Sequence, residues 1–257
     1  MDIRRASRQL PSGTTRSVFV VLGTLGMAWS ALTLPTFWNE FPIRQLSEHI
    51  VRGETFPLET LRNASLDFRH GVHLTACDAV AAHGGAVVEL AILDRSFATP
   101  ANAAVDSQIE ASRNSILSGL ACLPSDAFLW FELYRIESLQ SGLRAEYLRH
   151  LAMSYQVGAN EGWIAILRNK AAFAVFPALT TDLKSSVLDE FCLLLRTELY
   201  QEAIDIFLGS AEPYRDLIIA RIDAVPVQNR QAFADLLARK GIDAHIPGTS
   251  TTIRERP

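Results

Sequence analysis

The sequence lacks the short motifs that most often accompany catalysis or nucleotide binding. It contains no G-x-S-x-G nucleophile motif, no glycine-rich phosphate loop, no H-E-x-x-H zinc motif and no G-x-G-x-x-G dinucleotide motif. Its carboxylates, Glu132 and Glu137 among them, are scattered without the aromatic and basic neighbours of a sugar-cleaving site. These absences exclude the enzyme classes that depend on such motifs. We therefore predict a protein that is not an enzyme and that holds no cofactor.

Positive charge is scarce outside the first 16 residues. Only three of the 24 basic residues are lysines, a bias typical of a GC-rich bacterial genome. Residues 17–257 carry 20 basic and 27 acidic side chains, which gives a formal charge of −7. A surface of this sign does not attract phosphate groups, so we expect no nucleic-acid partner and no charge-driven binding to anionic lipid.

One stretch lacks charge altogether. No charged residue occurs from Ser17 to Trp38, and a helix needs roughly 20 residues to cross the hydrocarbon core of a membrane. Four arginines precede this stretch within residues 1–16, and Glu40 follows it. The positive-inside rule then places residues 1–16 in the cytoplasm. We predict a transmembrane helix over 17–38 in the inner membrane, with the remainder of the chain in the periplasm.

Two other interpretations of this stretch remain open. A cleaved signal peptide would combine the basic start with an apolar region over 18–28 and a small-x-small site at 28–30. A buried core helix is the second alternative. Because the apolar run continues past residue 30, a retained anchor is the interpretation that we favour.

Cysteine is also scarce, with three residues in the chain. A disulfide is favoured outside the cytoplasm, and Cys77 and Cys122 both lie near predicted helix ends. We predict that these two form the pair, although spacing alone does not fix the connectivity. Cys192 lies inside the apolar stripe of a predicted helix, where a buried and inert thiol is the usual case.

No long alternation of apolar and polar residues occurs, so strands are not expected. Apolar residues make up 49% of the chain, which excludes intrinsic disorder, and they recur at helical spacing. The sequence predicts an all-α domain over 39–240, arranged as a helix-pair solenoid or an irregular bundle, and a flexible tail over 241–257. Its first helix covers 41–52.

Several residues mark where the helices of this domain begin and end. Gly53 ends the first helix, and Asp126 and Asn160 open later ones. Gly241 is a predicted C-cap. The pair Gly84-Gly85 is predicted to break a helix, and the apolar run 86–93 that follows is compatible with either a strand or a helix.

A weak repeat runs through the middle of the chain. Trp130 and Trp163 stand 33 residues apart, and each follows a loop that carries helix-start residues. The stretch LRHLAMSYQVGANEGWIAI resembles the junction between helix pairs of tetratricopeptide repeats, whose period is about 34 residues. This resemblance implies stacked helix pairs that bind other proteins, with Trp130 and Trp163 as repeat anchors in the core.

The segments SDAFLWFELY and NEGWIAILRNKAAF, together with the basic anchor region, also resemble small envelope proteins of alphaproteobacteria. That resemblance implies a role connected with surface polysaccharide.

Two sets of residues are candidates for chemistry. His70, His73 and Cys77 have the spacing of one helix face and suit zinc or copper, although solvent-exposed histidines and a disulfide cysteine are the simpler interpretation. Glu132 and Glu161 are the carboxylates that an enzyme acting on envelope glycans would use. Solvated helix surface is the simpler interpretation of both, with Glu161 stabilising the first turn of its helix.

Three functional hypotheses follow from these features. The leading one is a membrane-tethered periplasmic scaffold that binds protein partners during envelope assembly or exopolysaccharide export. A glycan-active enzyme that uses carboxylates and a metal-binding accessory protein are the alternatives.

Overall fold

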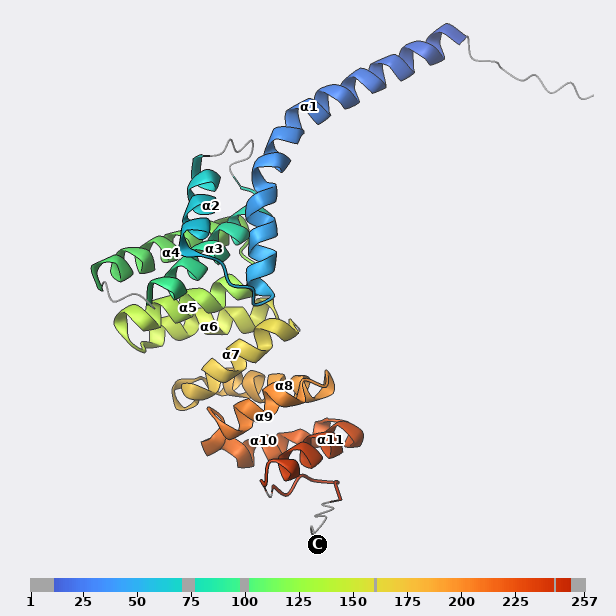
Figure 1. Cartoon of the computed structure of the whole chain (residues 1–257). Helices are drawn as coiled ribbons and strands as arrows, with labels where there is room; N and C mark the ends of the chain where they lie inside the picture. The colour runs from blue at the N-terminus through green and yellow to red at the C-terminus, as the bar shows by residue number, and fades with distance from the viewer. Residues whose placement is uncertain (1–11, 71–76, 98–101, 160, 243, 251–257) are drawn as a thin grey trace, which may run out of the picture. The chain divides into compact units, whose positions relative to one another are not determined.

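A computed structural model describes residues 12–70, 77–97, 102–159, 161–242 and 244–250. Helices account for nearly all regular structure in these ranges and no strand occurs in them, so the all-α prediction is confirmed (Figure 1). The chain divides into two compact units, Met1–Ser115 and Ile116–Pro257. The domain predicted over 39–240 therefore has parts in both units.

Unit 1 is built on one long helix, α1, which runs without a break from Ser12 to Val51. Its N-terminal part contains the predicted anchor, and its C-terminal part packs against α2 (Leu58–His70) and α3 (Ala79–Phe97). The sequence predicts a separate helix from residue 41, but in the structure the anchor helix bends and continues into the unit as part of α1 (Figure 1). Pro35 and Pro42 lie inside α1, each removing one backbone donor without ending the helix.

The two adjacent glycines of α3 lie inside the helix and do not end it. A Cβ atom on Gly84 would stand 3.2 Å from Ser47 Oγ of α1, and one on Gly85 would stand 3.1 Å from Phe68 Cε1 of α2. The absence of these Cβ atoms lets α3 approach both neighbouring helices. The predicted break is therefore wrong, and the run 86–93 is helical, because close helix packing overrides the poor helix propensity of glycine.

A buried carboxylate, that of Glu89 on α3, joins three helices of unit 1. Its Oε1 accepts hydrogen bonds from Ser65 Oγ and Arg69 Nη2 of α2, each at 2.5 Å. Its Oε2 accepts from Gln108 Nε2 at 2.8 Å, and its backbone oxygen accepts from Ser112 Oγ at 3.1 Å, both on α4 (Asn102–Cys122). A buried charge needs such donors in place of water, so Glu89 fixes the relative positions of the three helices.

Unit 2 is a stack in which most helix contacts join a helix to the next one or to the next but one along the chain. After α4 its elements are α5 (Ala127–Ser141), α6 (Ala145–Val157), α7 (Gly162–Ala174), η1 (Phe176–Ala178), α8 (Thr181–Arg196), α9 (Tyr200–Leu208), η2 (Glu212–Tyr214), α10 (Arg215–Arg221), η3 (Ile222–Ala224) and α11 (Val227–Arg239).

The helix spacing in unit 2 is regular at first and then lost. Helices α5, α7 and α9 begin at residues 127, 162 and 200, so the successive starts are 35 and 38 residues apart. Helices α5 and α6 form one pair, and α7 and α8 form the next. The short elements η2, α10 and η3 interrupt this order after α9.

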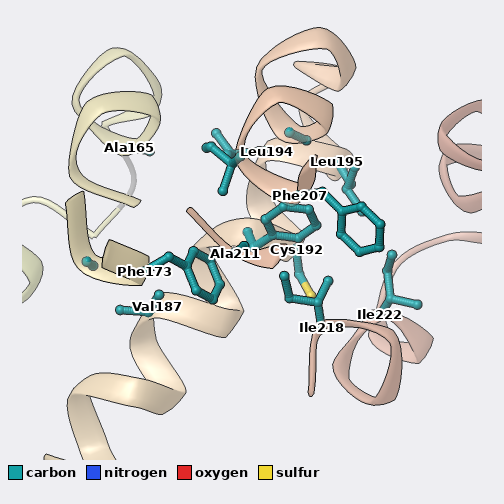
Figure 2. Packing of buried hydrophobic residues seen from close by; sticks show 14 of the residues in the cluster. Ala165, Phe173, Val187, Cys192, Leu194, Leu195, Phe207, Ala211, Ile218 and Ile222 are labelled. Carbon is teal, nitrogen blue, oxygen red and sulfur yellow. The ribbon is translucent and has the colours of Figure 1, made fainter. Parts of the chain in front are cut away.

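Phenylalanine rings dominate the core of unit 2. Phe191, Phe207 and Phe233 are fully buried, and their ring centroids lie 5.5 to 6.3 Å apart in tilted and edge-to-face contacts. Figure 2 shows side chains from α8, α9, α10 and η3 meeting in the same interior. Aromatic pairs of this geometry add about 0.5–1.5 kcal/mol each beyond area burial, which explains how short helices form a stable stack.

One predicted helix boundary is confirmed, and another is off by one residue. Asp126 is the N-cap of α5 and its Oδ1 accepts a hydrogen bond from Leu129 N at 3.0 Å. The C-cap of α11 is Lys240, one residue before the predicted Gly241, which follows it with a φ of +76°, a left-handed conformation that glycine adopts without strain. Asn160, the other predicted cap, lies outside the described residues.

The predicted flexible tail begins too early. Ile246 is only 1% exposed and belongs to the core of unit 2. Ser250 N donates to Gln231 Oε1 of α11 at 3.0 Å, and Arg230 Nη1 donates to the Pro247 carbonyl at 2.6 Å. The segment 244–250 is therefore packed on α11, and residues 251–257 lie outside the described part of the chain.

The C-cap of α6 gives a direct test of this packing. A Cβ on Gly158 would stand 2.2 Å from the Ala127 Cβ, closer than real atoms approach. We expect Gly158→Ala to separate α6 from the start of α5 and to lower the free energy of unfolding by about 1–3 kcal/mol. Urea unfolding of the full chain in detergent, followed by tryptophan fluorescence, measures this loss.

Gly162→Ala is the matched control, because a Cβ there meets nothing nearer than Leu199 Cδ1 at 3.9 Å. Alanine is the better helix former, so this variant should be as stable as the natural chain or slightly more stable. Equal unfolding midpoints for the Gly158 and Gly162 variants would contradict the packing described.

Candidate functional site

The candidate anchor is the part of α1 that no other segment of the structure covers. By length and composition, Thr15–Pro35 can cross a membrane: its mean hydropathy is 1.7 and 0% of it is buried. Trp29 and Trp38 are 71% and 74% exposed. The exposed apolar surface of this segment is therefore available to lipid, with one tryptophan within it and one just beyond it.

Helix α7 of unit 2 partly inverts the usual pattern of burial, because it buries polar side chains and exposes large apolar ones. Arg168 and Asn169 are fully buried, whereas Trp163 and Leu167 are 42% and 47% exposed. A surface helix of a globular protein normally buries its large apolar residues and exposes its charges. This inversion distinguishes α7 from an ordinary amphipathic surface helix.

The buried polar side of α7 ties three helices together. Arg168 pairs with Glu190 of α8 through its Nε, at 3.1 Å from Oε1, and through its Nη2. Its Nη1 donates to the Ser154 carbonyl of α6 at 2.5 Å, and its Nη2 donates to the Gly158 carbonyl at 3.0 Å. Arg168 thus adds side-chain donors to carbonyl groups at the end of α6, where the Ser154 carbonyl also accepts the Gly158 N–H at 3.1 Å.

Neighbouring side chains complete this buried network. Asn169 Nδ2 donates to the Val187 carbonyl at 2.8 Å and to Glu190 Oε2 at 3.3 Å. The Tyr155 ring lies under the guanidinium of Arg168, with 4.1 Å between Cζ and the ring centroid. Burial raises the pKa of the Glu190 carboxyl, and Arg168 opposes that rise. Burial and the nearby charge of Glu190 raise the pKa of Tyr155.

The exposed side of α7 presents two large apolar residues one turn apart. Trp163 and Leu167 are neighbours on one helix face, and the Trp163 ring packs on Phe128 of α5 with centroids 5.1 Å apart. Lys170, also exposed, continues the same face by one turn. We call Trp163, Leu167 and Lys170 the α7 face. A single exposed apolar residue is ordinary, but a rigidly held pair above a buried ion pair is suited to contact with a partner.

The two tryptophans predicted as repeat anchors occupy different environments, and neither lies in the buried core. Trp163 is 42% exposed on the α7 face. Trp130 is half-buried on α5, where its Nε1 donates to the Pro124 carbonyl at 2.8 Å and its ring stacks on His150 of α6 at 5.6 Å. Their common role as anchors of a repeat stays a prediction.

The carboxylates predicted for an enzyme do not form one site in the described geometry. Glu132 is 2% exposed and pairs with Arg135, with its oxygens 2.8 and 2.9 Å from Nη1. Glu161 is exposed at the N-cap position of α7 and makes no side-chain capping bond. One acid is thus buried against an arginine and the other faces solvent.

The structure describes two of the three candidate metal ligands. His70 is the last residue of α2 and is exposed, Cys77 precedes α3, and His73 lies outside the described residues. Among the described residues, no group of three or more histidine, cysteine, aspartate or glutamate side chains is arranged to hold a metal ion. The predicted cluster therefore stays untested as a unit.

Cys192 is a free thiol that is 1% exposed, and burial raises its pKa to about 11. Because the thiolate is the reactive form, iodoacetamide at pH 8 should not label Cys192 in the folded protein. After denaturation without reductant, intact-mass analysis should show one added group, and after reduction three. Three groups without reductant would contradict the Cys77–Cys122 disulfide, which stays a prediction.

Sequence reasoning missed the buried network, although a signal for it exists. Arg168 stands four residues after Ile164 and four before Ala172, both fully buried, so it falls in the buried row of α7. A charge in such a row indicates a buried partner. No protein-family model, curated protein or solved structure matches the chain significantly.

Proposed function

We propose that this protein is a membrane-tethered helical scaffold whose unit 2 binds another protein of the cell envelope through the α7 face. The observation that carries the proposal is the partial inversion of α7, which holds Trp163 and Leu167 in solvent above a buried ion pair. Stacked helix pairs commonly bind partners along an exposed helix face, and exposed aromatic residues are frequent at the centre of interfaces.

The tether is the second part of the proposal. The exposed, apolar N-terminal part of α1 belongs to the same helix whose C-terminal part forms the core of unit 1. Cleavage after residue 30 would cut this helix in its middle, so the continuity of α1 supports a retained anchor over a cleaved signal peptide. The arginines of residues 1–16 support a cytoplasmic N-terminus and a periplasmic location for both helical units.

The binding role is tested by placing a charge in the α7 face. Leu167→Glu should abolish co-purification of the partner from gently solubilised membranes, because the new carboxylate would have to be desolvated against an apolar surface. Leu217→Glu is the matched control, since Leu217 on α10 is 48% exposed and lies outside the α7 face. Identification of the same co-purifying protein with both variants would overturn the assignment of this face.

A further inference from the structure

A groove lies between α1 and α2, close to the end of the candidate span. Its volume is about 330 Å³, at the lower end of the roughly 300–1,000 Å³ of small-molecule sites. Its lining comes from two residues of α1 and five of α2: Pro42, Ile43, Thr60, Asn63, Ala64, Asp67 and Phe68. We propose that this groove binds the headgroup of a phospholipid that carries a primary ammonium group.

The position of the groove follows from the unbroken helix α1, and this step rests on the anchoring proposed above. The uncharged stretch of α1 ends at Trp38, and Pro42 follows four residues later in the same helix. At 1.5 Å per residue this is about 6 Å of helix. The headgroup layer adds roughly 5–8 Å on each side of the hydrocarbon core. Tilt of the helix would bring Pro42 closer still, so the groove opens at the level of the headgroups.

The second wall of the groove reaches the same level. Asp67 and Phe68 belong to the last turn of α2, and they line the groove together with Pro42 and Ile43. The C-terminal end of α2 therefore lies beside the part of α1 that follows the span. Phe41, one residue before the groove on α1, is 63% exposed and adds an aromatic side chain of the kind enriched at membrane interfaces.

The polar side of the groove has the chemistry to bind an ammonium group. Thr60, Asn63 and Asp67 follow the i, i+3, i+7 spacing of one face of α2, and all three are exposed. No other described residue makes an ion pair or side-chain hydrogen bond with them. The Asp67 carboxylate and the Asn63 amide oxygen, about one turn apart, can accept N–H bonds from a primary ammonium, and the Thr60 hydroxyl, one turn further along α2, can donate to the adjoining phosphate.

The same residues disfavour other headgroups. A trimethylammonium group has no N–H to donate, so it would leave the oxygens of Asp67 and Asn63 without hydrogen bonds. An anionic headgroup without an amine would meet the negative charge of Asp67. The apolar wall formed by Ile43 and Phe68 suits the methylene and glycerol carbons of the lipid in either case, so selectivity resides in Asp67.

The test is native mass spectrometry of the full chain in detergent, with equal amounts of phosphatidylethanolamine, phosphatidylcholine and phosphatidylglycerol added. We expect the natural chain to retain phosphatidylethanolamine about two- to fivefold more than either other lipid, the range that one exposed charge pair produces. Asp67→Asn should remove this preference. Glu59→Gln, which changes an exposed acid of α2 outside the groove, should preserve it.

Ala64→Phe is a second variant, because Ala64 lines the groove and a larger side chain would fill it. It should lower retention of all three lipids, with helix content unchanged by circular dichroism. Equal retention of the three lipids by the natural chain, or an unchanged preference in Asp67→Asn, would overturn the proposal. Since lipid is added in detergent, this outcome is independent of whether α1 spans a membrane in the cell, which membrane fractionation decides separately.

Discussion

Replacing Arg168 with methionine will lower the free energy of unfolding by about 3–5 kcal/mol, a large fraction of the stability of an ordinary domain. The natural side chain is fully buried, and its partner Glu190 is 4% exposed. Methionine leaves that carboxylate without a counter-charge, and it removes the guanidinium hydrogen bonds to the carbonyl groups of Ser154 and Gly158. Urea unfolding of the full chain in detergent measures the loss, with Trp163 as a reporter in unit 2.

Two controls separate the buried pair from arginine loss in general. Arg221→Met removes an exposed ion pair with Asp189, whose oxygens lie 2.7 and 2.8 Å from the guanidinium, and the unfolding midpoint should hardly move. The double variant Arg168→Met with Glu190→Met should recover most of the lost stability, because no unpaired charge remains buried. A double variant as unstable as Arg168→Met would show that the ion pair is not the source of the effect.

The fold class was accessible from sequence because apolar spacing reports helices directly, and local chemistry located several of their ends. Asp126 and Gly241 act within their own turns, so a single sequence reveals them. The effect of Gly84 and Gly85 is not local. Their place inside α3 depends on Ser47 and Phe68 of other helices, which no local rule includes. Predictions failed where a tertiary contact reversed a local preference.

The candidate site likewise has one part that the sequence reveals and one part that depends on tertiary contacts. The apolar run of α1 is visible from composition, and its exposure in the structure agrees with that interpretation. The α7 face was not predicted, because Trp163 was assigned to the core as a bulky residue near a helix start. Its exposure follows from the burial of Arg168 and Asn169 on the other side of α7, and that burial depends on acceptors in α6 and α8. Only the assembled helices bring these groups together.

Arginines in the middle of the candidate span should release the protein from the membrane. Leu22 and Leu25 lie near the centre of Thr15–Pro35 and are 59% and 62% exposed. Each arginine at the centre of a spanning helix costs about 2.5–3.5 kcal/mol, so Leu22→Arg with Leu25→Arg opposes insertion twice over. We expect the natural chain to stay in the pellet of alkaline-washed membranes and the double variant to move to the supernatant.

The control adds the same two charges where no membrane contact is proposed. Gln140 on α5 and Gln201 on α9 are exposed in unit 2, and their replacement by arginine should leave the protein in the membrane pellet. Release of the natural chain by the alkaline wash would exclude a spanning α1. Because α1 is one helix from the span to the core of unit 1, that result would also remove the physical basis for placing the α1–α2 groove among lipid headgroups.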